Sequence, residues 1–330
     1  MRPFAYERAD SPETARAAAG AGGATSSFLA GGTTLIDLMK LDVMRPQRVI
    51  DINGIGETQI DLADDRLRLG ASVRMTDAER HADLRRRLPM LTQSLALAAS
   101  TQIRNMATLG GNVLQRTRCP YFRDVSWSAC NKRAPGSGCA ALDGFNRQHA
   151  VLGTSEACIA TYPGDFAQAL IALDATVEIL GRAGRRQIPF SELHVQPGQT
   201  PDVETTLAPG ELILGFAMPV EPWFSRSLYL KIRDRQSYEF ALASAAVALD
   251  LAGGAIRQAR IALGGVATVP WRAREAEQAL IGRAADEATF QLAADIAFSE
   301  ARPLRHNAFK PALGRQTVVR ALLQAAAMET

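Results

Sequence analysis

All four cysteines of this 330-residue chain lie in one stretch that has no regular pattern. Residues 115–153 are rich in Pro, Gly, Ser, Asn and Arg, and neither a helical nor a strand period continues through them. A loop of this length is uncommon inside a compact domain and indicates a functional insertion, which we place at about residues 115–160. The cysteines it contains are Cys119, Cys130, Cys139 and Cys158.

Four thiols could hold one iron–sulfur cluster or one structural zinc, form two disulfides, or be inert. Disulfides suit small secreted domains, zinc usually takes closely spaced cysteine pairs, and the sequence has no C-x-x-C. A cluster is favoured because Pro120 follows Cys119, and because Gly136-Ser137-Gly138 lets the backbone approach sulfur closely. Nearby cations also favour thiolates, although a solvated loop could contain them too. These cations are Arg116, Arg118, Arg123, Lys132 and Arg133.

Two glycine-rich turns have the composition of a phosphate site. In the first, Phe28-Leu29-Ala30 ends a predicted strand, Gly31-Gly32-Thr33 forms a turn, and residues 34–40 have helical character. The second is Thr108-Leu109-Gly110-Gly111-Asn112. Neither matches a G-x-G-x-x-G or a Walker loop, and a single Gly-Gly is usually only a turn. Two such turns, each with threonine, favour a dinucleotide ligand.

The remaining periodicity predicts an α+β protein of two or three lobes, because 330 residues exceed one ordinary core. A boundary is expected near residue 221, after a strand ending at Pro219. Expected strands cover residues 49–52, 67–73, 176–180, 212–218, 227–232, 241–251 and 257–263. Expected helices cover 76–100, interrupted at Pro89, then 165–173, 271–280, 284–301 and 310–327.

Composition excludes several classes of function. The net charge of +3 is too small to indicate a nucleic-acid partner, and no apolar stretch approaches the ~20 residues of a membrane span. The N-terminus shows no cleavable signal, so we expect a cytoplasmic protein or one exported with a signal-bearing partner. The four histidines have neither metal nor triad spacing and are interpreted as structural: His81, His149, His194 and His306.

Both glycine turns, the second preceded by Gln102-Ile103-Arg104-Asn105, resemble the two FAD-binding motifs of flavin subunits in the xanthine dehydrogenase, or molybdenum hydroxylase, family. The resemblance continues through the whole chain in the same order. It includes Pro163-Gly164-Asp165, where relatives often carry Ser at the position of Gly164, then Gly210-Glu211-Leu212-Ile213, Lys231-Ile232-Arg233, residues 262–267 and Pro270-Trp271-Arg272.

Most family members pass quickly from the Gly-Gly-Asn block to the Pro-x-x-Asp segment, but here about 50 residues intervene. That insertion resembles a subgroup with an extra [4Fe–4S] cluster, which includes 4-hydroxybenzoyl-CoA reductase. Residues 117–122, 130–133 and 136–142 are most similar to the flavin subunits of bacterial periplasmic aldehyde oxidoreductases.

The resemblance implies a fold and a set of contacts. The fold is a PCMH-type (vanillyl-alcohol-oxidase-like) FAD domain over 1–221, with lobes of about 1–55 and 56–221, followed by a small α+β CO-dehydrogenase-flavoprotein-type domain over 222–330. Thr108 would contact the phosphates or ribityl chain, Asp165 a ribose or ribityl hydroxyl, the Ile213 backbone the isoalloxazine, and Lys231 the ring. The implied FAD contacts are Ser27, Phe28, Leu29, Ala30, Gly31, Gly32, Thr33, Thr34, Leu35, Thr108, Gly110, Gly111, Asn112, Asp165, Ile213 and Lys231; the four cysteines are the implied cluster ligands.

The resemblance also implies a role in electron transfer, without catalytic side chains for substrate in this chain. A large subunit with the molybdenum cofactor would oxidise an aldehyde, and a small subunit with two [2Fe–2S] clusters would pass electrons to FAD. The acceptor would be oxygen, ferredoxin or a quinone, and the heterotrimer periplasmic or cytoplasmic. Two alternatives stay open: a 4-hydroxybenzoyl-CoA-reductase-like complex, and a zinc-stapled scaffold protein without flavin.

Overall fold

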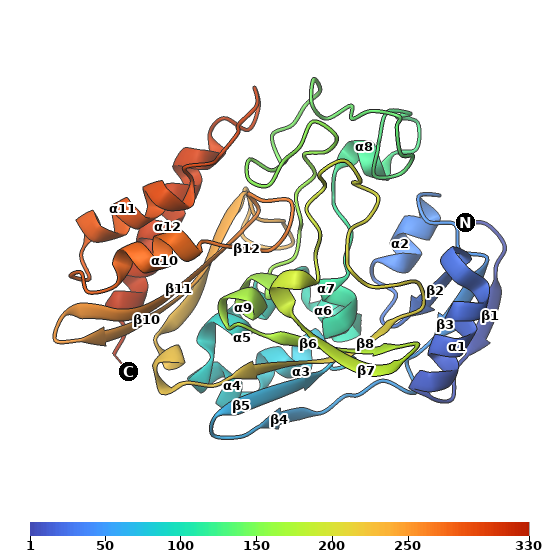
Figure 1. The fold of residues 1–330 in the computed structure, drawn as a ribbon, viewed down its shortest axis with the longest axis horizontal. Coiled ribbons are helices and arrows are strands. Elements are labelled where there is room, and N and C mark those ends of the chain that lie inside the picture. The colour runs from blue at the N-terminus through green and yellow to red at the C-terminus, as the bar shows by residue number, and fades with distance from the viewer. Residues whose placement is uncertain (330) are drawn as a thin grey trace.

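The computed structural model describes residues 1–329, arranged around three β-sheets (Figure 1). The first sheet is parallel with the order β1-β3-β2, and β3 pairs with both neighbours. Ser11 caps the N-terminus of helix α1, and its side chain forms a capping box with Thr14. The elements are β1 Ala5–Arg8, α1 Pro12–Gly22, β2 Ser26–Leu29, α2 Leu35–Lys40 and β3 Arg48–Asp51, with a 3₁₀ turn at Gly23–Thr25.

The second sheet is antiparallel, with the order β4-β5-β8-β6-β7, and carries the largest core of the molecule. Phe166, Phe190 and Phe216 meet edge to face in this core. The strands are β4 Ile60–Leu62, β5 Arg66–Gly70, β6 Thr176–Gly181, β7 Gly184–Pro189 and β8 Leu212–Pro219. The helices are α3 Met75–Arg80, α4 Ala82–Arg87, α5 Pro89–Ala96, α6 Thr101–Met106, α7 Leu109–Val113 and α9 Phe166–Ala172, with a 3₁₀ turn at Phe190–Glu192.

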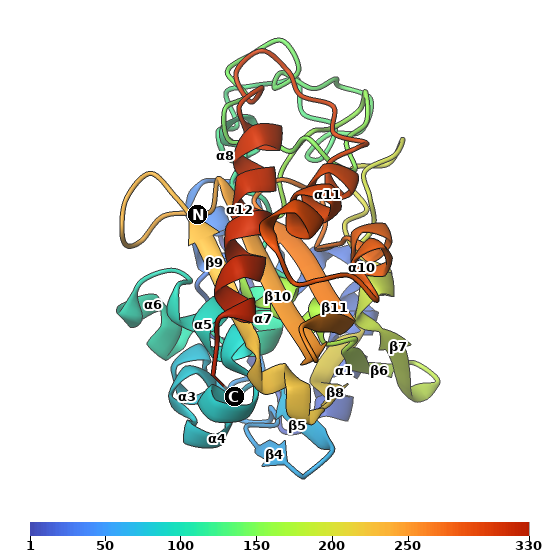
Figure 2. The same ribbon diagram turned by 90° about the vertical axis from the view of Figure 1, so that its left-hand side faces the viewer.

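The third sheet has the order β12-β11-β10-β9, and its helices cover one face (Figure 2). Strand β10 is buried on both sides: Val247 and Leu249 pack under the helices, while Ala246 and Ala248 join the second sheet's core. Small residues on that face let the two lobes approach closely. The elements are β9 Ser227–Ile232, β10 Ala243–Ala252, β11 Ala255–Gly264, β12 Trp271–Arg272, α10 Arg274–Leu280, α11 Glu287–Ala297 and α12 Lys310–Ala326, after a 3₁₀ turn at Pro222–Ser225.

The cysteine-bearing segment projects beside these lobes as loops, with one short helix, α8 Pro120–Arg123 (Figure 1). Isolated β-bridges between backbone segments hold these loops together. The backbone of Cys130 forms such a bridge with that of Cys139, Ser155 with Cys158, and Leu152 with Ala267 of the third-sheet lobe. The expected lack of periodicity here is confirmed.

Most expected elements form, with two corrections. The predicted helix over 76–100 is three helices, because His81 caps α4 and the non-helical backbone of Leu88 ends α4 before Pro89 begins α5. The predicted helix over 271–280 begins with strand β12 and becomes helical only at Arg274. Among residues 1–329, no helix is both long and apolar enough to cross a lipid bilayer.

Candidate functional site

The two glycine turns predicted to bind phosphate line one cavity of about 260 Å³ between the first and second sheets. The β2–α2 turn contributes Gly31 and Gly32, the start of α7 contributes Gly110 and Gly111, and β8 closes the far side with Ile213. Of the remaining predicted contacts, Ser27, Phe28, Ala30, Thr33, Thr34, Leu35 and Thr108 also line it. Leu29 instead packs against the core beneath β3.

Backbone contact holds the two turns together. A Cβ on Gly31 would lie 2.0 Å from the Met106 carbonyl oxygen, so this position accepts only glycine. Gly32 adopts φ +73°, in the left-handed region. The Asn53 side chain donates to the Ala30 carbonyl at 2.9 Å, and Arg74 joins Asn53 to the Met106 carbonyl.

The turns present free donors to the cavity. Throughout residues 1–329, no protein acceptor takes the backbone N–H groups of Gly32, Thr33 and Thr34. The Thr108 hydroxyl accepts from the Gly111 N–H at 3.2 Å and thereby caps α7. Unpaired amides beside glycines suit an anionic, phosphate-bearing ligand.

A second cavity of about 490 Å³ adjoins the first, and Thr33 and Thr34 line both. Its walls include Asn112 and Asp165, both predicted FAD contacts. An elongated ligand can therefore extend across the β2–α2 turn with a part in each cavity, as a dinucleotide requires.

Asp165 and Lys231 form a buried ion pair in the wall of this second cavity. The Lys231 Nζ donates to Asp165 Oδ2 at 2.7 Å and to the Leu97 carbonyl at 3.0 Å, with only 1% of its side chain exposed. The other carboxylate oxygen accepts from the Tyr229 hydroxyl at 2.6 Å. Burial, and then the adjacent Asp165 charge, raises the pKa of Tyr229. Lys231 therefore lies behind Asp165, which is itself the cavity-lining group.

The four cysteines are free thiols gathered by the turns of the cysteine-bearing segment. Cys119 directly precedes α8, and the backbones of Cys130 and Cys139 are paired by an isolated β-bridge. The Asn131 side chain accepts from the Gly138 N–H at 2.8 Å, and Gly138 adopts φ +93°. These contacts close the loop between the second and third cysteines.

The thiols lie close enough to interact electrostatically. The pKa of Cys119 is raised to about 12, chiefly by burial and in small part by Cys130 and Cys158. Burial also raises the pKa of Cys158, which Lys132 opposes. Within residues 1–329, no three Cys, His, Asp or Glu side chains converge on a position for a single metal ion. Four free thiols in one segment supply the number of thiolates that a cubane takes, one for each iron.

The predicted cations mainly form ion pairs that hold the cysteine-bearing segment to neighbouring elements. Asp37 of α2 accepts from Arg118 at 3.1 Å and from Arg123 at 2.8 Å. Glu204 pairs with Arg116, and with Lys132 at 2.8 Å. The ion pairs of Asp37 join the cysteine-bearing loops to α2, the helix that follows the first glycine turn. The cysteine loops and the wall of the glycine-turn cavity are therefore in direct contact.

The comparisons with known proteins agree with this architecture. Residues 2–221 match the family model of the FAD binding domain in molybdopterin dehydrogenase, and residues 228–330 match that of the CO dehydrogenase flavoprotein C-terminal domain. The chain belongs to the FAD-binding subunits of the molybdopterin hydroxylases. The family expected from the motifs is therefore confirmed, and with it an α+β flavoprotein fold.

Several relatives of this flavoprotein family cover nearly the whole chain. It is 47% identical over 330 residues to the aldehyde oxidoreductase FAD-binding subunit PaoB of Escherichia coli, covering 99% of each chain. It is 28% identical over 324 residues to the carbon monoxide dehydrogenase medium chain of Hydrogenophaga pseudoflava, covering 97% of this chain and 96% of that one. The solved Hydrogenophaga pseudoflava carbon monoxide dehydrogenase superposes with a TM-score of 0.77 at 27% identity, over 99% of this chain and 98% of the other.

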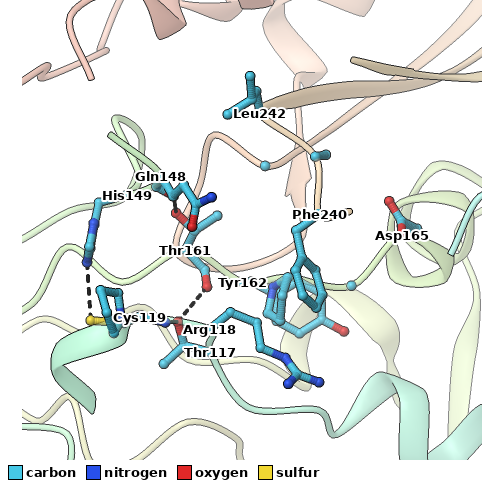
Figure 3. A pocket seen from close by; sticks show the side chains of 15 residues that line it. Thr117, Arg118, Cys119, Gln148, His149, Thr161, Tyr162, Asp165, Phe240 and Leu242 are labelled. Atoms are coloured by element: carbon cyan, nitrogen blue, oxygen red, sulfur yellow. Dashed lines mark hydrogen bonds between the residues drawn. The ribbon is translucent and has the colours of Figure 1, made fainter. Parts of the chain in front are cut away.

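One residue near the cysteines of this flavoprotein was assigned only a structural role from the sequence. His149 is buried, and its Nε2 lies 3.2 Å from Cys119 Sγ (Figure 3). Burial, and then the charge of Lys310, lowers the pKa of His149 to about 4. The two residues are 30 positions apart in the sequence, so no short-range motif could have predicted their contact. A small cavity of about 40 Å³ that both line extends to Asp165.

Proposed function

We propose that this chain is the FAD- and [4Fe–4S]-binding electron-transfer subunit of a heterotrimeric molybdenum aldehyde oxidoreductase. The observation that carries the proposal is 47% identity over 330 residues to the FAD-binding subunit of an aldehyde oxidoreductase. Bound FAD would supply a carrier that takes and gives electrons singly or in pairs. Aldehyde oxidation itself would take place in a large molybdenum-cofactor subunit, with a small two-[2Fe–2S] subunit between them.

The chain would hold FAD across the two adjoining cavities. The free amides of the β2–α2 turn and the Thr108–Gly111 turn would bind the pyrophosphate, because they combine donors with close backbone access. Asp165 would accept from a ligand hydroxyl, since it lines the second cavity and Lys231 fixes it in place. The Ile213 backbone would contact the ring system from β8.

The chain would hold the cluster through Cys119, Cys130, Cys139 and Cys158. All four are free thiols, lie in one inserted segment and interact electrostatically. We assign the insertion to residues 115–160 of a FAD domain spanning 1–221, followed by a C-terminal domain over 222–330.

The substrate class is tested on the complex rather than on this chain alone. We propose to co-express the chain with its large and small partner subunits and to assay aldehyde-dependent reduction of a dye. The expected result is aldehyde oxidation that depends on bound FAD. Reduction of an aromatic CoA thioester without aldehyde oxidation would instead assign the chain to a 4-hydroxybenzoyl-CoA-reductase-like complex. The same preparation, assayed with oxygen, a ferredoxin and a quinone, would identify the acceptor, and cell fractionation would identify the compartment.

A further inference from the structure

Cys119 is half-buried, and a histidine side chain contacts its sulfur. His149 Nε2 lies 3.2 Å from Cys119 Sγ, within hydrogen-bond distance of the sulfur. Figure 3 shows the imidazole pointing at the sulfur from the loop that precedes Ala150. The fold therefore brings a ring nitrogen from a residue 30 positions away onto this sulfur.

The chemistry of a ligating thiolate sets the direction of this contact. Sulfur bound to iron carries no proton, so it can only accept, and His149 Nε2 must donate. The other ring nitrogen, Nδ1, is buried, and no protein atom among residues 1–329 hydrogen-bonds to it. A neutral ring with its single proton on Nε2 satisfies both observations.

The position of His149 is set by its backbone rather than by the sulfur. Its N–H donates to the Asn146 carbonyl at 3.0 Å, and the next residue, Ala150, donates to the Ile159 carbonyl at 3.0 Å. The Asn307 side chain, from the loop before α12, donates to the Ala150 carbonyl at 3.1 Å. The loop is thus held to the segment carrying the fourth cysteine and to the C-terminal lobe.

We propose that His149 is a positioning residue that donates an N–H···S hydrogen bond to the Cys119 thiolate and thereby raises the reduction potential of the cluster. The proposal rests on the proposed [4Fe–4S] site. Reduction adds one electron to the cluster and increases the negative charge on its sulfurs, so a donor stabilises the reduced form more than the oxidised form. Loss of the donor should therefore make the cluster harder to reduce.

The test is a redox titration of the anaerobically purified heterotrimer, with the cubane followed by low-temperature electron paramagnetic resonance. His149→Phe keeps a ring but removes the donor, whereas His149→Gln retains an N–H that can reach sulfur. We expect the Phe variant to lower the equilibrium constant for reduction about tenfold, which is about 59 mV for a one-electron couple. The Gln variant should stay near the wild-type potential. His194→Gln is the matched control, because His194 is a partly buried histidine bonded to the Val113 carbonyl instead of a thiolate.

An unchanged potential in His149→Phe, with all iron retained, would overturn the proposal, as would equal shifts in the Phe and Gln variants. If the Phe variant does not assemble, wild-type enzyme labelled with ¹⁵N-histidine decides the matter. Electron–nuclear double resonance should then detect a histidine nitrogen coupled to the reduced cubane, and its absence would contradict the hydrogen bond. A wild-type heterotrimer without cubane iron and sulfide would refute the proposed function itself, an outcome separate from an unshifted potential.

Discussion

Replacing Gly31 with alanine should separate the two turns that form the first cavity. The added Cβ would lie 2.0 Å from the Met106 carbonyl oxygen and 2.7 Å from its carbon, and both are backbone atoms. Reaching a 3.0 Å contact requires a shift of about 1 Å. The Met106 carbonyl is also held by Arg74, which bonds Asn53 on the opposite side. The shift would therefore strain the hydrogen bonds of Arg74 to Met106 and Asn53 as well as the β2–α2 turn.

The size of the effect follows from the cost of forcing an extra carbon into packed backbone. Overpacking of this kind costs about 1–3 kcal/mol. If that cost falls on the geometry that binds FAD, the dissociation constant for FAD rises about 5- to 150-fold. If it falls on folding instead, the thermal midpoint decreases and FAD binding to the folded protein changes less.

The assay is FAD titration of the deflavinated complex by fluorescence, with thermal unfolding on the same sample. Gly20→Ala is the matched control, because a Cβ at Gly20 meets no atom within 4 Å and Gly20 lies inside α1. Alanine there should be neutral or stabilise the helix by up to about 1 kcal/mol. A Gly31→Ala variant with wild-type FAD affinity and wild-type thermal midpoint would refute the reasoning about the turns.

Three further substitutions test other parts of the account. Cys130→Ser should distort or abolish the cluster while FAD remains, and intact cluster absorbance with full iron would remove Cys130 from the ligand set. Asp165→Asn leaves the Lys231 ammonium buried without its partner, which should cost about 3–5 kcal/mol in urea unfolding, and a loss under 1 kcal/mol would contradict the ion pair's role. Burial lowers the pKa of Lys310 from 10.5 to about 7, so the folded chain binds fewer protons than the unfolded chain between these values. Its contribution to stability should therefore rise with pH across that window, by about 3 kcal/mol from pH 7 to pH 9.5, and Lys310→Met should remove this rise; equal pH profiles for both proteins would contradict it.

The sequence pattern predicts a helix or strand correctly where the segment is long, periodic and buried. Strand β10 and helix α12 were predicted because apolar residues recur along them and pack into a continuous core. Strands β1 and β7 were missed because their residues are mostly exposed and polar, so no buried face marks them in the sequence. Their pairing depends on neighbouring strands distant in the chain.

The features of the candidate site also differ in whether the sequence predicts them. The glycine turns and the four cysteines carry their chemistry in residue type, so the sequence alone predicts them as candidate site residues. The contact of Gly31 with Met106, and that of His149 with Cys119, join segments far apart in the chain. Such contacts depend on how the loops close, and a single sequence has no periodic signal for them.

The most direct test of the central proposal is an absorption spectrum of the heterotrimer purified without air, with iron, sulfide and zinc measured on the same sample. We predict flavin bands over a broad shoulder near ~400 nm, with about eight irons per heterotrimer, of which four belong to this chain and four to the two [2Fe–2S] clusters. Flavin with only about four irons and one zinc would show that the cysteines hold a structural metal, and would contradict the iron–sulfur role proposed for this subunit.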